Sequence, residues 1–211
     1  MAALDPGLIG VLGVAGFFTT WYFAAQIYSR RLARRIGTEL KGAVLGLGGR
    51  SRIQWFGTTA FRMTTEEANP PFKEVSITVT LRPREMPINW AIATGQGRRD
   101  SALVEASLRK DPDVHFELVD PLSRIGRRRM RVKADWATLS LGERQLLFSS
   151  DRERMARQIL GELPVESLGP IMALHVSSGS QPGISASVSV ERGRAAEGLA
   201  AIRGLAERLA R

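Results

Sequence analysis

The apolar run at residues 7–28, GLIGVLGVAGFFTTWYFAAQIY, constrains this chain more than any other feature. Apart from its two tyrosines, the run contains no ionisable side chain. The hydrocarbon core of a bilayer is about 30 Å thick, and an α-helix needs roughly 20 apolar residues to cross it. Few helices of water-soluble proteins are apolar on every face over such a length. The run therefore predicts a transmembrane helix rather than a helix buried in a soluble core.

Charged residues on the two sides of the run predict its orientation. Only Asp5 and the terminal amine precede it. Four arginines follow it directly: Arg30, Arg31, Arg34 and Arg35. The positive-inside rule places this arginine-rich end in the cytoplasm. A cleaved signal peptide fits poorly, because a basic segment before the run and an A-x-A site after it are both missing.

This orientation predicts a single-pass protein of the cell inner membrane with four parts. We expect a short extracytoplasmic N-terminus at residues 1–6, the transmembrane helix at 7–28, a basic juxtamembrane linker at 29–40 and a cytoplasmic domain at 41–211. The basic linker and domain favour contact with the anionic headgroups of membrane lipids.

Small side chains form a stripe along the predicted transmembrane helix. Gly16, Thr20 and Ala24 recur every four residues, which places them on one helix face and permits close approach of another helix. We therefore expect the anchor to self-associate or to pack against another membrane protein. The alternative is that glycine is simply frequent in membrane-spanning helices.

Composition limits the chemistry of the remaining chain. Cysteine is absent, which excludes disulfides, thiolate metal sites and cysteine nucleophiles. The net charge of +9 favours anionic partners, namely lipid headgroups, nucleic acid or an acidic protein. Arginine greatly outnumbers lysine and suits bidentate contacts with phosphate. A GC-rich genome would produce the same bias without functional meaning.

The pattern of apolar residues predicts an α+β fold with a mainly antiparallel sheet and helices on one face. Residues 72–81 alternate between apolar and polar side chains, which predicts a strand with one buried face. Residues 132–211 suggest two successive strand–strand–helix units, or the order ββαββα. A capping box of Ser150 and Glu153 predicts the start of the first helix. An apolar stripe ending at Leu209 predicts the second helix.

The segment at residues 82–99, RPREMPINWAIATGQGRR, combines an apolar patch with flanking arginines. Pro87 predicts the start of a short helix that carries Trp90, and Arg98 and Arg99 follow it. A tryptophan with neighbouring cations suits a segment that rests at the headgroup boundary of a membrane. The alternative is a loop whose Trp90 fills the core of the domain.

Residues 124–133 form the densest basic cluster outside the flank of the anchor. Its arginines are Arg124, Arg127, Arg128, Arg129 and Arg131, and Lys133 ends it. Such a cluster is able to bind phosphates of lipid or of nucleic acid. Because no aromatic residues alternate with the arginines to stack on bases, lipid or an acidic protein is favoured. A membrane-tethered nucleic-acid-binding protein is the alternative, and a mobile, solvated basic turn is a third interpretation.

Carboxylates and a histidine recur at every second position near residue 115. Residues 102–108 and 114–119 suggest a hairpin, in which the second strand would place Asp111, Asp113, His115 and Glu117 on one face. Such a face is able to ligate a divalent ion or to act in acid–base chemistry. A hydrolase or metal-dependent enzyme is therefore a further alternative, and the solvated face of an amphipathic strand is its simpler interpretation.

The sequence contains none of the catalytic motifs that would identify an enzyme. It has no H-E-x-x-H, no G-x-S-x-G elbow and no Walker A loop. We therefore expect no cofactor, metal or catalytic residue. The favoured function is a non-catalytic accessory, assembly or binding module at the inner surface of the membrane.

Overall fold

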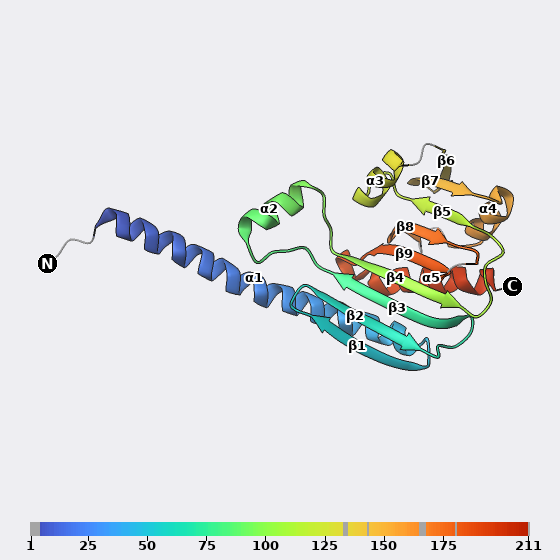
Figure 1. Ribbon diagram of the computed structural model, residues 1–211, viewed down its shortest axis with the longest axis horizontal. Coiled ribbons are helices and arrows are strands. Elements are labelled where there is room, and N and C mark those ends of the chain that lie inside the picture. The colour runs from blue at the N-terminus through green and yellow to red at the C-terminus, as the bar shows by residue number, and fades with distance from the viewer. Residues whose placement is uncertain (1–4, 133–134, 143, 165–167, 180, 211) are drawn as a thin grey trace.

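The computed structural model joins one long N-terminal helix to an antiparallel sheet of nine strands, as expected for an α+β protein (Figure 1). It describes residues 5–132, 135–142, 144–164, 168–179 and 181–210. The helices are α1 (Pro6–Leu45), α2 (Pro87–Gly95), α3 (Arg124–Val132), α4 (Glu153–Gly161), η2 (Glu191–Gly193) and α5 (Ala195–Leu209). The strands are β1 (Arg50–Phe56), β2 (Ala60–Glu66), β3 (Phe72–Thr80), β4 (Ser101–Leu108), β5 (Phe116–Val119), β6 (Ala137–Leu141), β7 (Arg144–Ser150), β8 (Ile171–Val176) and β9 (Ile184–Ser189).

The strands follow the spatial order β1-β2-β3-β4-β9-β8-β5-β7-β6. The predicted hairpin of residues 102–108 and 114–119 is therefore wrong, because β9 and β8 lie between β4 and β5. Each strand has only two edges, and β4 uses both of them to pair with β3 and β9. Strand β4 thus pairs with the distant β9 and not with the next strand in the sequence, and this pairing joins the two halves of the chain.

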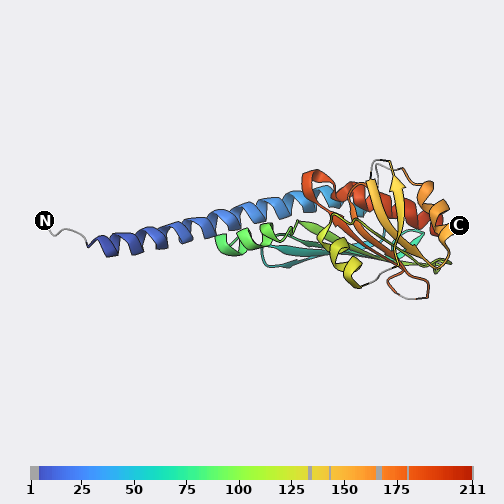
Figure 2. The same cartoon turned by 90° about the horizontal axis from the view of Figure 1, so that it is seen from above.

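One face of the sheet is apolar and is covered by helices. A row of partnered residues crosses this face from Val79 through Ala102 and Val188 to Ile171, and all four are buried. Helices α1, α4 and α5 lie on this side (Figure 2). A side chain at Gly198 would collide with Val188, so only glycine lets α5 approach β9 this closely.

The second half of α1 belongs to the core of the domain. Ala33, Ile36, Leu40 and Val44 are buried, and the helix contacts α5 and β2. Their spacing of three and four residues defines one apolar face, while arginines occupy the other. Residues 29–40 were expected to form a linker, but they continue the helix because this apolar face has the sheet and α5 to pack against.

The first half of α1 projects away from the domain (Figures 1 and 2). Within the described residues, α1 is the one helix long and apolar enough to cross a membrane. Its 40 residues correspond to a length of about 60 Å. Almost none of its most apolar window is buried, so this half is not a core helix of the domain.

The C-terminal elements run in the order β6, β7, α4, β8, β9, η2 and α5, and residues 165–167 lie outside the described part. The predicted apolar stripe of α5 is confirmed, because Leu199, Ile202, Leu205 and Leu209 are buried. The predicted capping box is wrong. Helix α4 begins at Glu153 without a side-chain cap, and Ser150 Oγ instead donates to the His115 carbonyl.

Candidate membrane-facing surface and arginine cleft

Helix α2 packs against the projecting half of α1 through two tryptophans. The ring centroids of Trp21 and Trp90 are 5.8 Å apart, with an angle of 54° between the planes. Trp21 Nε1 also donates a hydrogen bond of 2.9 Å to the carbonyl oxygen of Arg84. The short helix predicted at Pro87 is confirmed. Trp90 does not fill the core of the domain, because its neighbour is the exposed half of α1 and 37% of its surface is exposed.

The large aliphatic side chains of α2 are exposed. They are Ile88 and Ile92, and Met86 directly before the helix is exposed as well, whereas Ala93 is buried. Figure 1 shows α2 displaced from the sheet toward the projecting half of α1, whose apolar side chains are exposed as well. Two segments far apart in sequence thus present uncovered apolar side chains in the same part of the molecule.

A buried ion pair closes the base of the segment that carries α2. Arg84 Nη2 lies 2.6 Å from Asp100 Oδ2, and the two side chains are at most 10% exposed. The other carboxylate oxygen of Asp100 accepts a hydrogen bond of 2.7 Å from the backbone N–H of Arg82. The Arg84 guanidinium also lies 5.4 Å from the centre of the Tyr28 ring in α1. These contacts fix where α2 leaves and rejoins the sheet.

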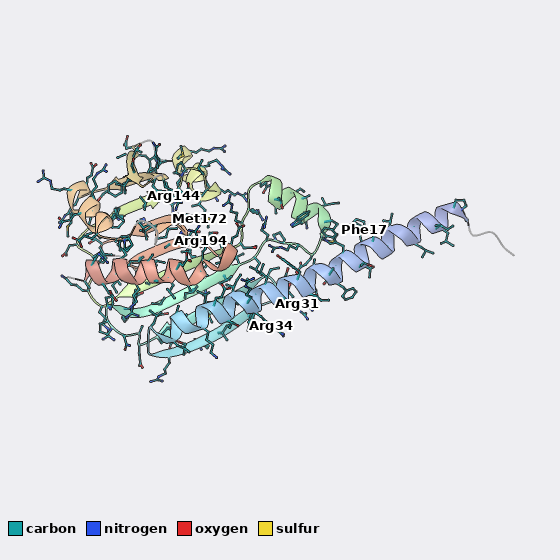
Figure 3. The ribbon with its side chains drawn as sticks, turned by 180° about the vertical axis from the view of Figure 1, so that it is seen from behind. Phe17, Arg31, Arg34, Arg144, Met172 and Arg194 are labelled. Atoms are coloured by element: carbon teal, nitrogen blue, oxygen red, sulfur yellow. The ribbon has the colours of Figure 1, made fainter. Side chains whose placement is uncertain are left out.

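The four arginines that follow the apolar run are exposed on the outer side of α1: Arg30, Arg31, Arg34 and Arg35. Arg35 pairs with Glu39 at 3.1 Å on the same helix. Figure 3 shows Arg31 and Arg34 where α1 meets the domain, and Phe17 farther along the projecting half. The change from apolar to cationic surface therefore coincides with the edge of the domain.

The predicted packing stripe of α1 is also exposed. Gly16, Thr20 and Ala24 all lie on the projecting half, and no atom lies within 4 Å of a side chain built at Gly16. None of the described residues therefore covers this position. Association of the anchor through the stripe stays a prediction.

The structure brings Arg98 and Arg99 together with Arg124 and Arg127. The loop after α2 and the start of α3 line one hollow of about 580 Å³. A second hollow of about 580 Å³ adjoins it and shares three arginines with it, namely Arg82, Arg98 and Arg99. We refer to the two hollows together as the arginine cleft.

The second hollow is lined by two arginines that the sequence did not single out, Arg144 on β7 and Arg194 at the start of α5. Figure 3 shows them on either side of Met172. Arg144 is held in place, since its Nη2 lies 2.8 Å from Asp120 Oδ2 and its Nη1 donates to the carbonyl oxygens of Leu168 and Gly169. Asp120 also lines the cleft, but its charge is already compensated by this contact.

Residues 124–132 of the basic cluster form a helix rather than a turn, and the arginines of this helix have different surroundings. Arg129 pairs with the buried Glu117 of β5 at 3.1 Å. Arg128 and Arg131 are exposed and do not line the cleft. A side chain at Gly126 would collide with the Asp120 carbonyl, so this glycine lets α3 approach the end of β5. Lys133 lies outside the described residues.

The proposed face of carboxylates and histidine does not form. Strand β5 begins at Phe116, so Asp111 and Asp113 precede it and do not share a strand face with Glu117. Asp113 instead lies 3.9 Å from the Lys110 ammonium. The His115 ring packs against His175 with centroids 5.0 Å apart. Within the described residues, no group of three or more histidines and carboxylates is placed to hold a metal.

Sequence reasoning missed Trp21, Asp100, Arg144 and Arg194 as parts of these sites. Each one acquires its role through a contact between segments that are distant in sequence, which local patterns do not report. The chain matches none of the protein-family models with which it was compared, and no curated protein is significantly similar to it.

Proposed function

We propose that this chain is a single-pass membrane protein of the inner membrane whose cytoplasmic α+β domain acts as a non-catalytic accessory, assembly or binding module. Residues 7–28 cross the bilayer with the N-terminus outside. Anionic lipid headgroups contact the exposed arginines that follow, and a second copy or another membrane protein packs against the anchor.

The junction of Trp21 and Trp90 carries this proposal. A helix of a water-soluble domain buries its apolar side chains, yet α2 exposes Ile88 and Ile92 beside an equally exposed half of α1. Lipid is the environment that accommodates both surfaces at once. Tryptophan is also the residue that prefers the boundary between hydrocarbon and headgroups, where its ring is apolar and its N–H is polar.

The same junction indicates how deep α2 would lie. Trp21 precedes Tyr28 by two helical turns, or about 10 Å along α1. If Arg30 and Arg31 mark the headgroups, α2 enters the cytoplasmic leaflet by roughly this distance, which is the depth of an interfacial amphipathic helix. The domain would then be attached to the membrane at two points, and its orientation would be restricted.

Extraction of membranes tests the anchor. After high-speed centrifugation of a detergent-free lysate, and again after washing with alkaline carbonate, we expect the full chain in the pellet. Recovery of the folded chain in the supernatant would contradict the proposal. Protease protection of tags at the two ends tests the orientation, with the C-terminal tag expected on the cytoplasmic side.

Purification in a mild detergent tests the function as an assembly module. We expect the chain to elute as a dimer or in a complex with a membrane protein, and Gly16→Leu should reduce this association because it fills the small-residue stripe. Recovery as a free monomer in every detergent would contradict a role in assembly.

Nucleic acid is the alternative anionic partner. Its binding would decrease steeply with salt and would be lost on charge reversal at Arg127, Arg128 and Arg129. Binding that is absent or insensitive to salt would exclude this alternative.

A further inference from the structure

The arginine cleft concentrates positive charge that the described protein residues do not neutralise. Asp120 pairs with Arg144, and Glu191 lies 3.9 Å from Arg82. Among the described residues, Arg98 and Arg99 have no ion pair and no side-chain hydrogen bond. Concave surfaces lined by one sign of charge focus the field and raise the local concentration of counter-ions. The unpaired cations therefore favour an anionic ligand.

Arg82 provides a second, independent indication. Its side chain lines both hollows as well as the neighbouring pockets beside Tyr28 and Asp100. Its Nε is buried without a hydrogen-bond partner among the described residues. The nearest carboxylate oxygen, Asp100 Oδ1, is 3.9 Å away, which is too long for a hydrogen bond. Buried donors are nearly always satisfied, so the incompletely paired guanidinium of a residue that lines the cleft favours an anionic ligand beside it.

The residue type narrows the chemistry of that acceptor. The planar guanidinium group donates two parallel hydrogen bonds to phosphate oxygens, and this match favours arginine over lysine in phosphate sites. Each hollow has a volume in the range of small-molecule sites, and is larger than a single phosphate requires. The ligand would thus carry at least one phosphate group together with further polar atoms.

We propose that the arginine cleft binds a phosphorylated ligand, either a phosphate monoester or a diphosphate. Arg98 and Arg99 bind its phosphate oxygens from the loop after α2, and the guanidinium group of Arg82, which lines both hollows, adds positive charge beside them. Arg144 stays oriented by Asp120 and forms the floor. The source of the phosphate is a lipid headgroup or a soluble metabolite, because the same chemistry serves both.

Titration of the full chain with inorganic pyrophosphate tests this site. The protein is kept in micelles of a neutral detergent, so the test does not depend on placement in a bilayer. We expect saturable binding by isothermal titration calorimetry. The double variant R98Q/R99Q should weaken it by about tenfold or more, because hydrogen bonds to charged groups are among the strongest available.

Helix α3 offers a matched control. The variant R128Q/R131Q also removes two positive charges, but from exposed positions that do not line the cleft. Its affinity for pyrophosphate should change by less than about twofold, because salt screens attraction between distant exposed charges. R98K/R99K keeps the charge but loses the bidentate geometry, and should bind with intermediate affinity. Thermal unfolding of each variant shows whether the domain remains folded.

Two results would overturn the proposal. One is the absence of pyrophosphate binding to the wild-type chain. The other is equal weakening in R98Q/R99Q and R128Q/R131Q, which would show attraction to net charge without a built site. Neither result would contradict the proposed membrane anchor, since carbonate extraction tests the anchor independently.

Nanodiscs distinguish the two sources of phosphate. Pyrophosphate is titrated into wild-type chain in discs that contain phosphatidic acid, and into discs with phosphatidylglycerol at matched surface charge. A headgroup ligand with a phosphate monoester lowers the apparent affinity only with phosphatidic acid, because the lipid competes for the cleft. Equal affinity in both discs identifies a soluble phosphorylated ligand.

Discussion

The two halves of α1 are one continuous helix in two different environments. Val44 in the second half is 3% exposed and contributes to the core, whereas Val14 in the first half is 58% exposed. The second half places its apolar residues on one face and its arginines on the other, while the first half is apolar all round. A helix segregates its side chains where protein covers one face and water the other. The uniform half suits the uniform, apolar solvent that we propose for it.

Substitution of Val44 and Val14 should give the largest difference between the two halves of α1. Val44→Asp buries an unpaired carboxylate in the core and should cost more than about 4 kcal/mol in the free energy of unfolding. Val14→Asp should leave the stability of the domain unchanged, and should instead oppose insertion by about 2.5–3.5 kcal/mol. Near-UV circular dichroism in detergent measures the first effect, and carbonate extraction the second. Equal destabilisation of the domain by both variants would show that the first half is also part of the core.

The buried pair of Arg84 and Asp100 offers the next largest effect. Asp100→Asn leaves a buried guanidinium uncompensated and should destabilise the segment at residues 82–100 by about 3–5 kcal/mol. We expect faster cleavage by trypsin after Arg98 and Arg99. Arg157→Gln is the control, because its exposed pair with Glu153 should contribute only about 0–1 kcal/mol. Unchanged proteolysis in Asp100→Asn would mean that other contacts position α2.

The contact between the tryptophans should have a moderate effect. Trp21→Ala removes a ring contact of about 0.5–1.5 kcal/mol and a hydrogen bond of about 1 kcal/mol. Helix α2 should separate from α1 more often. Since the chain has no cysteine, Ala93→Cys introduces a sole thiol at a buried position, and its labelling by a maleimide should accelerate by about tenfold. Trp55→Ala, which removes a ring contact between β1 and Phe61 of β2, should not change this rate.

The smallest effect concerns the arginines at the boundary. R31Q/R34Q should change the stability of the domain by less than about 0.5 kcal/mol, because both side chains are exposed. Each arginine near an anionic surface contributes about 1 kcal/mol of attraction, so the fraction of molecules with the N-terminus outside should decrease. Protection of an N-terminal tag from protease measures this fraction. R152Q/R154Q removes equal charge from exposed positions at the start of α4 and should leave the orientation unchanged.

The sequence predicted the features that depend on local pattern. The α+β class, the short helix at Pro87 and the buried stripe that ends at Leu209 follow from periodicity, and each is present. The sequence did not indicate that the basic segment at residues 29–40 continues the helix and packs on the domain. Its four arginines dominate the composition, and the apolar face of Ala33, Ile36 and Leu40 is visible only once α5 and β2 are there to cover it.

The candidate sites depend on contacts between distant segments and were predicted only in part. Arg98, Arg99, Arg124 and Arg127 stood out as local clusters, but nothing in the sequence indicated that they line one cleft. Arg144 and Arg194 lie outside the dense basic clusters of the sequence. Their role follows from the strand order, which brings β8 and β9 between β4 and β5 and so joins the two halves of the chain.

Spin-label accessibility on the full chain in lipid vesicles tests whether the projecting half of α1 and helix α2 lie in lipid. Single cysteines at Val14, Ile92 and Ser187 place one label on the projecting half of α1, one on α2 and one on the sheet. We expect the labels at positions 14 and 92 to be accessible to dissolved oxygen but not to a water-soluble nickel complex. The label at 187 should be more accessible to the nickel complex than to oxygen. If the nickel complex reached positions 14 and 92 as readily as position 187, both helices would lie in water. This result would contradict a membrane location for α1 and α2.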